Sequence, residues 1–361
     1  MSVYEARLQR DLNQIRELVT TLSERVERSL ENAVQVVFSG NEDLAYRTVL
    51  GDAAANRLCR ELDRRCHAFV ALHLPSAGHL RRLSSTLRVN LQLERVGDYA
   101  VTISREAMQL SSRPTGVIAR ELEMVANDVC RMLHQSIEAF REGNGEVARA
   151  TMHLADNAEH TMDQLYEDLM GGENDGPPLK DLVAIFAIYS MLKRVWDQAK
   201  NICEETVFAV FGETKPAKIY KLLFIDEDNS ALGPMAEAIG RKNFSERALY
   251  ASGGRTPARR LDPSMVAFME SHGFDLSQMK PVAFDSKPEK LSDYFVIVSL
   301  QGPVRSYVGK VPFHTSALAW DVGSAPSGLG EAETRQRYEE LYRELTGQLR
   351  DLADLLAGET T

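Results

Sequence analysis

Three acidic residues stand where an apolar segment gives way to an alanine-rich helix. The stretch LLFIDEDNSALGPMAEAIGRK, residues 222–242, predicts a buried strand, a tight loop and a helix that begins near Pro234. This order is typical of anion-binding sites, because the N–H groups at the start of the helix point at the ligand. The loop, however, contains Asp226, Glu227 and Asp228. Three carboxylates repel a phosphate, and they suit a capped helix or a bound cation better.

A second acidic pair, Glu94 and Asp98, has a spacing of four, so a helix places both carboxylates on one side, where they repel each other. The same side carries Leu87 and Leu91, so it is not plainly a solvated surface. Two interpretations remain open. The pair binds a hard cation through its oxygens, or it belongs to a solvated charged face on which Arg95 neutralises it.

The predicted secondary structure that carries these residues changes near residue 214. Before it, apolar residues at helical spacing predict six long helices, at residues 3–38, 42–72, 79–110, 117–141, 146–170 and 179–211. After it, the apolar runs KLLFI, ALYAS and YFVIVS alternate with amphipathic stretches. The predicted fold is therefore all-α at first, followed by an α/β domain with a parallel sheet.

The helical part repeats itself. The segments LERVGDYAVTI (93–103) and LKRVWDQAKNI (192–202) share six of their eleven residues. We therefore expect two three-helix units, at about 1–112 and 113–213, and a linker at 214–217. Both segments contain an apolar stripe at helical spacing, which we assign to the core and to no chemistry.

Composition excludes several classes of protein. The 361 residues have a formal net charge of −10, which argues against binding to nucleic acid or to an anionic membrane. No apolar run is long enough to span a membrane, and residues 1–11 lack a signal-peptide core, so we expect a cytoplasmic protein. The four cysteines are scattered, which indicates buried free thiols rather than disulfides or a zinc site.

The motif ERVGDYA (94–100), together with the duplicated units, resembles the PhoU family of phosphate-uptake regulators over residues 1–213. The resemblance implies tandem three-helix bundles that bind divalent or iron-type metal ions through paired carboxylates. It also implies a homodimer that silences a phosphate transporter ATPase and a phosphate-sensing histidine kinase when phosphate is plentiful, and thereby regulates transcription.

The second copy of the motif departs from this pattern. Lys193 stands at the position of the first acid and Trp196 at that of the glycine, so that only Asp197 remains. An ammonium group cannot be a metal ligand, but it can pair with an acid one turn away. We therefore expect one of the two family metal sites to be lost.

The second helix of each copy offers a weaker candidate ligand. Asp52 is followed four residues later by Asn56, and Asp156 by His160. Each pair could face the third helix of its unit and add oxygen or nitrogen ligands there. Polar positions on an exposed helix face explain the same pattern equally well, so only Asp52 and Asp156 are kept as candidates.

The α/β part resembles the low-molecular-weight protein tyrosine phosphatases and the related arsenate reductases. The resemblance covers about residues 218–356 and leaves 357–361 as a tail. Asn229, Ser230 and Pro234 match the phosphate-loop motif in register. A family member needs a thiolate nucleophile, an arginine six residues later for the phosphoryl oxygens, and an acid for the leaving group.

The residues that act on phosphate are replaced. Asp226 stands at the nucleophile position, Leu232 at the arginine position and Gly233 at that of an assisting serine. Only Asp321 corresponds to the general acid, and Val322 follows it where the family has proline. We therefore predict a pseudoenzyme domain that serves binding or dimer formation.

One alternative is an enzyme that acts on phosphoryl or arsenate groups with an unusual nucleophile, such as Asp226. Enzymes of that kind neutralise the incoming dianion with Mg²⁺ or basic side chains, whereas this loop adds two further acids. All four cysteines lie within residues 59–203, so the α/β part has no thiol. The regulator interpretation is the better supported.

Overall fold

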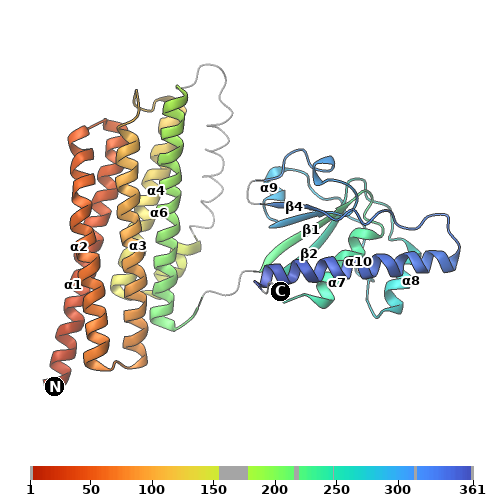
Figure 1. Cartoon of the computed structure of the whole chain (residues 1–361), viewed down its shortest axis with the longest axis horizontal. Coiled ribbons are helices and arrows are strands. Elements are labelled where there is room, and N and C mark those ends of the chain that lie inside the picture. Colours follow the sequence, from red (N-terminus) through yellow and green to blue (C-terminus); the bar gives the residue numbers. More distant parts are fainter. Residues whose placement is uncertain (1–2, 154–177, 215–218, 247, 313–314, 359–361) are drawn as a thin grey trace. The chain divides into compact units, whose positions relative to one another are not determined.

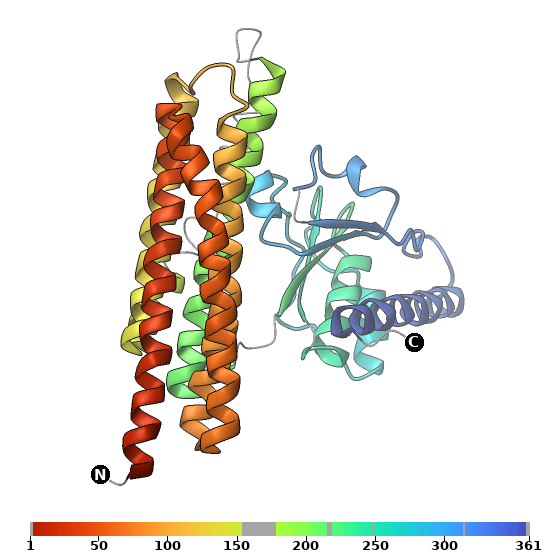
Figure 2. The same cartoon turned by 60° about the vertical axis from the view of Figure 1, so that its left-hand side comes forward.

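The computed structural model describes the chain except for residues 1–2, 154–177, 215–218, 247, 313–314 and 359–361. The chain divides into two compact units, Met1–Lys215 and Pro216–Thr361. The first unit is built of long helices and the second contains a sheet with helices packed on it (Figures 1 and 2). The predicted fold class, helices followed by an α/β domain with a parallel sheet, is confirmed.

The described part of the helical unit contains five long helices. They are α1 (Val3–Ser39), α2 (Glu42–His73), α3 (Ala77–Ala107), α4 (Gly116–Glu142) and α6 (Leu179–Phe211). Residues 145–153 are also helical, and the rest of the helix predicted for 146–170 lies outside the described residues. The order α1–α2–α3 corresponds to the first predicted unit, and α4 and α6 belong to the second.

The third helices of the two units, α3 and α6, pack side by side along their length. Both helices carry the repeated apolar stripe, whose members are all buried in one core, as the sequence predicts. In α3 the stripe comprises Val89, Leu93, Val96, Ala100 and Ile103, and in α6 it comprises Ile188, Leu192, Val195, Ala199 and Ile202. The duplication therefore brings the two ERVGDYA-type segments into one helix pair.

Turn residues end the helices where the sequence has its breakers. Asn41 begins α2 by accepting the N–H of Leu44 at 3.0 Å, and α4 and α6 end at Gly143 and Gly212, whose φ angles are positive. The predicted bounds of α3 were wrong at both ends. The helix ends at Ala107 because Gln109 donates its N–H to Glu106 O in a tighter turn.

The second unit contains a four-stranded sheet in the order β2-β1-β3-β4, with all strands parallel. The strands are β1 (Tyr220–Asp226), β2 (Ala248–Gly254), β3 (Val296–Ser299) and β4 (Ser316–Ala319). The long helices are α7 (Leu232–Asn243), α8 (Pro263–Ser271) and α10 (Glu331–Ala357), and the short ones are α9 (Pro288–Leu291) and η1 (Val304–Ser306). Because β1 and β3 are neighbours, the strand order reverses beside the end of β1.

Two sheet elements differ from the prediction. The third strand begins at Val296 rather than Tyr294, because Tyr294 donates its N–H to Leu291 O in the turn that follows α9. β4 was not predicted at all. Its four residues are exposed, so they show none of the apolar alternation that marks a half-buried strand.

Candidate functional site

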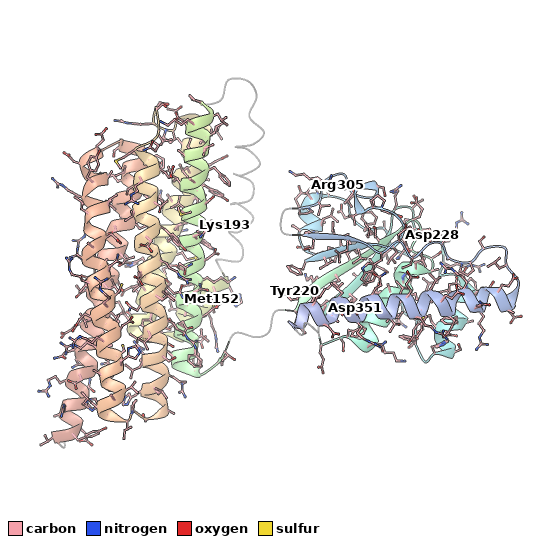
Figure 3. All side chains as sticks on the ribbon, viewed as in Figure 1. Met152, Lys193, Tyr220, Asp228, Arg305 and Asp351 are labelled. Carbon is pink, nitrogen blue, oxygen red and sulfur yellow. The ribbon has the colours of Figure 1, made fainter. Side chains whose placement is uncertain are left out.

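Asp226 is the last residue of β1, and the loop that follows it leads directly into α7. Figure 3 labels Tyr220, the first residue of β1, and Asp228, which lies in the loop two residues after the strand ends. The register pairs Asp226 with Gly254 at the end of β2, and Ile225 with Ser299 at the end of β3. Asp226 therefore lies at the carboxyl edge of the sheet, where open α/β sheets bind their ligands.

The Asp226 side chain is held by backbone N–H groups. Asn229 donates its N–H to Oδ1 at 2.6 Å, and Gly233 donates its N–H to Oδ2 at 2.7 Å. Only 2% of Asp226 is exposed. The carboxylate thus accepts hydrogen bonds from N–H groups that a bound anion would otherwise use, including one in the first turn of α7.

Burial raises the pKa of Asp226 from 3.8 to about 6. The two backbone N–H groups favour the charged form and oppose this effect, whereas the nearby charges of Asp228 and Glu227 add to it. The carboxyl group is therefore still mostly ionised at neutral pH, although burial makes its charged form less favourable than it is in water.

The other two acids of the loop turn to different partners. Asp228 Oδ1 accepts the N–H of Ser230 at 3.0 Å and its hydroxyl at 2.8 Å, while Glu227 lies 3.6 Å from Arg255 Nη1. The three carboxylates are not arranged around a cation. Indeed, across the described residues no group of three His, Cys, Asp or Glu side chains is placed to hold a metal ion.

The shape of the loop depends on two unusual positions. Asn229 has a φ of 51°, and its Oδ1 accepts the N–H of Val282 at 3.0 Å. A Cβ atom at Gly233 would lie only 2.6 Å from Asn229 Nδ2 and 3.1 Å from Asp226 Oδ2. The serine that the phosphatase resemblance expects at Gly233 therefore does not fit beside the Asp226 carboxylate.

Leu232 packs in the core of the α/β unit, and Asp321 accepts a hydrogen bond. Leu232 is the first residue of α7, is 3% exposed and belongs to the core of the unit. Asp321 follows β4 with a φ of 40°, and its Oδ1 accepts the N–H of Gly302 at 3.2 Å. Asp321 thus connects the loops that follow β3 and β4.

Two residues beside the Asp226 loop were missed by the sequence analysis. Arg255 donates its backbone N–H to Asp226 O at 3.1 Å, and its guanidinium lies 4.6 Å from the centre of the Tyr307 ring. Arg255 directly follows the last residue of β2. Because parallel strands end at the same edge, this position already indicated that Arg255 lies near Asp226.

In the helical unit, Asp52 of α2 faces α3 at Gly97. A Cβ atom at Gly97 would lie 3.4 Å from Asp52 Oδ1, and Asn56 donates its Nδ2 to Asp52 Oδ2 at 2.7 Å. Asp52 Oδ1 and Asn56 Oδ1 are buried and accept no hydrogen bond. Partial burial and the charge of Asp52 raise the pKa of Asp98. The unsatisfied oxygens of Asp52 and Asn56, with the one further acid Asp98 near them, are of the kind that a hard cation binds.

Glu94 lies near the same α2–α3 contact. Burial raises the pKa of the Cys59 thiol to about 12, and the charges of Glu94, Asp63 and Asp52 contribute to this rise. Arg95 is exposed and forms no ion pair with Glu94 or Asp98 among the described residues. Arg95 therefore neutralises neither acid, and Glu94 is half-buried whereas Asp98 is exposed.

The second repeat is only partly described. In α6, Trp196 is buried, and Asp197 is an exposed residue one turn after Lys193. Asp156 and His160 lie outside the described residues. The structure thus places Asp52 near Asp98 in the first repeat but does not gather three acids at one point there. The candidate ligand Asp156 of the second repeat stays a prediction.

The four cysteines have no disulfide partner. Cys59, Cys66 and Cys203 are buried as expected, but Cys130 is half-buried, so the prediction of burial was wrong for this residue. Burial raises the pKa of every one of these thiols to about 12. They are poor nucleophiles at neutral pH, since the thiolate is the reactive form.

Comparison with known proteins shows that the helical unit is similar to PhoU domains. A model described as PhoU domain matches residues 19–107 and 122–206. The phosphate-specific transport system accessory protein PhoU of Edwardsiella tarda is 29% identical over 56% of this chain and 84% of its own length. The crystal structure of PhoU from Pseudomonas aeruginosa, 23% identical, covers 57% of this chain and 99% of its own with a TM-score of 0.54.

These matches define a PhoU-like helical region that includes both repeats. For the α/β unit, the tyrosine phosphatase Wzb from Escherichia coli K30 is 15% identical over 37% of this chain and 99% of its own, with a TM-score of 0.31. That score is too low to establish relatedness. Among the described helices, none combines the length and apolar character that crossing a membrane requires.

Proposed function

We propose that this protein is a regulator of phosphate uptake and phosphate-responsive signalling, in which the helical unit acts and the α/β unit is a binding module. The observation that carries the proposal is the PhoU-domain match across both helical repeats. The relatives that share this region include proteins named phosphate-specific transport system accessory protein. The packing of α3 on α6 supports the same two-repeat arrangement.

The partners that fit this role are the ATPase of a phosphate transporter and a phosphate-sensing histidine kinase, with this protein as a cytoplasmic homodimer that restrains both and thereby regulates transcription. A pull-down of the full chain from phosphate-replete cells tests the proposal. We expect transporter ATPase and kinase subunits to be recovered. Recovery of neither contradicts the proposal, and sedimentation of the purified protein tests the dimer.

We further propose that the helical unit binds a divalent or iron-type metal ion between α2 and α3. Asp52 and Asp98 would hold the ion, with Glu94 and the orphaned oxygen of Asn56 beside them. A bound cation would offset the repulsion between these acids. The second repeat, with Lys193 near Asp197, contributes less to such a site.

Elemental analysis tests the metal site. We expect the metal content of a Glu94→Gln, Asp98→Asn double variant to fall well below that of the wild type. The matched control is Glu17→Gln, Glu24→Gln, which removes two exposed acids from α1. Equal metal in the wild type and the α3 variant removes these residues from the site.

The α/β unit is, in this proposal, a pseudoenzyme. The supporting observation is that the Asp226 carboxylate accepts both N–H groups at the turn into α7, in a loop without thiol or arginine. We expect the full chain to hydrolyse no aryl phosphate with or without Mg²⁺ or Mn²⁺. Hydrolysis that is abolished by Asp226→Asn would instead support the alternative, an enzyme with an aspartate nucleophile.

A further inference from the structure

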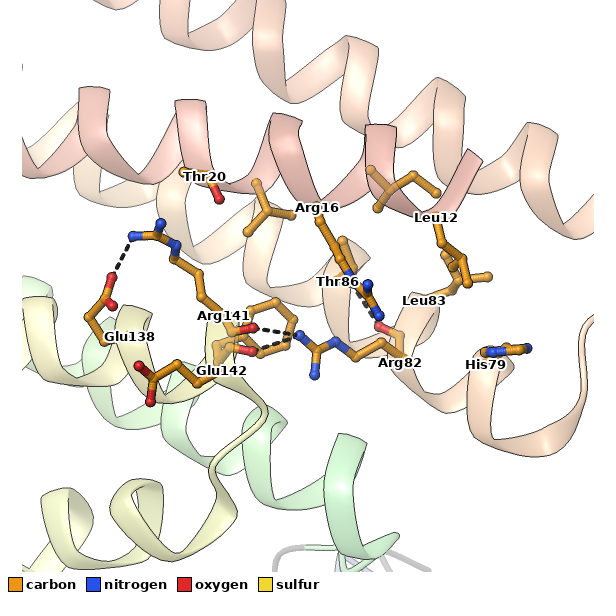
Figure 4. Close-up of a pocket in the computed structure, with 13 residues that line it drawn as sticks. Leu12, Arg16, Thr20, His79, Arg82, Leu83, Thr86, Glu138, Arg141 and Glu142 are labelled. Atoms are coloured by element: carbon orange, nitrogen blue, oxygen red, sulfur yellow. Dashed lines mark hydrogen bonds and ion pairs between the residues drawn. The ribbon is translucent and has the colours of Figure 1, made fainter. Parts of the chain in front are cut away.

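A cavity of about 370 Å³ lies in the helical unit between α1, the first half of α3 and the end of α4 (Figure 4). Small-molecule sites commonly have volumes of about 300–1,000 Å³, so the cavity can accommodate a ligand of modest size. None of its lining residues belongs to the α2–α3 acids or to the Asp226 loop. The cavity is therefore separate from both sites discussed above.

One side of the cavity is apolar. Three successive turns of α1 contribute to it, together with one residue from α3 and an aromatic ring from α4. These residues are Leu12, Ile15, Val19, Leu83 and Phe140, and each of them is less than 10% exposed. Such a surface can cover the body of an organic ligand but not a bare inorganic ion.

The other side is cationic, and Arg82 is its fixed member. Arg82 Nη2 donates to Phe140 O at 2.8 Å and to Arg141 O at 3.3 Å, while its guanidinium lies 4.9 Å from the centre of the Phe140 ring. These contacts hold the group at the carboxyl end of α4. Burial lowers the pKa of Arg82, and the nearby positive charge of Arg16 lowers it further.

Arg16 extends from α1 into the same cavity (Figure 4). It donates to the neutral Asn13 Oδ1 at 3.4 Å, and it forms no ion pair within the described parts of the chain. Of the acids that line the cavity, Glu138 is already paired with Arg141 at 2.5 Å. Glu142 is exposed and is not paired with Arg16. Of the three arginines that line the cavity, Arg141 is paired with Glu138, while Arg16 and Arg82 have no carboxylate partner among the described residues.

We propose that this cavity binds a small organic phosphate, whose phosphoryl group lies between Arg16 and Arg82 and whose body packs on the apolar side. Guanidinium groups bind phosphoryl oxygens through paired, charge-assisted hydrogen bonds, and a phosphate monoester carries enough charge to serve two of them. Arg82 is already positioned by α4, so little side-chain freedom is lost on its side of the ligand.

Titration calorimetry of the full chain with adenosine monophosphate tests this site, since that probe joins a phosphate monoester to an aromatic body. We expect adenosine monophosphate to bind more tightly than either adenosine or inorganic phosphate. Arg16→Ala should weaken binding by about tenfold or more, because a charged hydrogen-bond donor is lost. Arg16 is exposed, so the variant should fold as the wild type does.

Arg28→Ala is the matched control, because it removes another exposed arginine from α1 that does not line the cavity. It should leave the affinity unchanged. The proposal is overturned if adenosine monophosphate does not bind, or if Arg16→Ala and Arg28→Ala have the same effect. Inorganic phosphate that binds as tightly as adenosine monophosphate would overturn the role of the apolar side.

Discussion

Asp226 is an acid that the fold surrounds with backbone N–H donors rather than with a basic side chain. Its two oxygens accept from Asn229 and Gly233, and the nearest basic group of the loop, Arg255, faces Glu227 instead. The Asp226 carboxylate thus occupies the N–H groups of the loop that a bound anion would need. A dianion entering from solution would have to displace a covalently attached carboxylate that is already desolvated.

The pKa of about 6 at Asp226 predicts how this residue affects stability with pH. In the unfolded chain the group loses its proton near 3.8, before the folded state does, so its stabilising contribution is complete below about pH 4 and is lost as the pH rises toward 6. We expect the stability of the wild type relative to Asp226→Asn to decrease across this window. Denaturant unfolding at several pH values measures it, and a carboxyl titration by NMR with a midpoint below 4 contradicts it.

A side chain introduced at Gly233 should clash with its neighbours and lower the free energy of unfolding. In Gly233→Ser the new side chain would meet Asn229 Nδ2 and Asp226 Oδ2, so we expect a loss of about 1–3 kcal/mol in the free energy of unfolding. The control is Gly347→Ala in α10, where the added methyl has no heavy atom within 4 Å and helix propensity favours alanine by up to about 1 kcal/mol. Urea unfolding should therefore give opposite signs, and a neutral Gly233→Ser is inconsistent with the loop geometry.

At the scale of elements, the contact between α2 and α3 combines an apolar stripe with buried polar groups. Asn90 is 3% exposed, and its Nδ2 donates to Cys59 O at 2.9 Å and to Asp63 Oδ1 at 2.8 Å. These bonds join the two helices in a fixed register, near the acids that we propose as metal ligands.

Asn90→Ala should therefore destabilise the helical unit by about 1–3 kcal/mol, because it removes the buried hydrogen bond from Asn90 to Cys59 O. Urea unfolding followed by circular dichroism measures the change. Asn13→Ala, at an exposed position on α1, is the control and should alter stability by less than about 0.5 kcal/mol. If the two variants behave alike, the Asn90 bonds do not hold the helix pair.

Helical periodicity was enough to predict the five long helices that the structure describes, and the alternation of apolar runs with amphipathic stretches was enough to predict the parallel sheet. They could not predict β4, because its exposed residues follow no pattern, nor the end of α3, which depends on a local turn. The hydrogen bond from the Gly233 N–H to the Asp226 side chain also could not be predicted from the sequence. It spans seven residues and requires the left-handed conformation of Asn229, which a list of residue types does not reveal.

At the scale of the molecule, each unit has a hydrophobic core of its own. The larger core lies among α1, α2, α3, α4 and α6, and a second one joins the sheet to α7, α8 and α10. No residue of the described chain belongs to both. Separate cores of this kind are the mark of domains that can unfold separately.

Calorimetry of the full chain should accordingly show two unfolding transitions. Leu62→Ala removes a fully buried side chain from α2, and Leu345→Ala does the same in α10. Each should destabilise its own unit by about 2–5 kcal/mol and leave the other transition in place. A single transition that both variants shift equally would mean that the units unfold together.

The distribution of the cysteines has a practical consequence. All four thiols lie in the helical unit, and three of them are buried. A thiol-specific reagent added during heating or denaturation therefore reaches Cys59, Cys66 and Cys203 only as that unit opens, while the α/β unit has no thiol to label. Labelling at Cys59, Cys66 and Cys203 therefore reports the unfolding of the helical unit without an introduced cysteine.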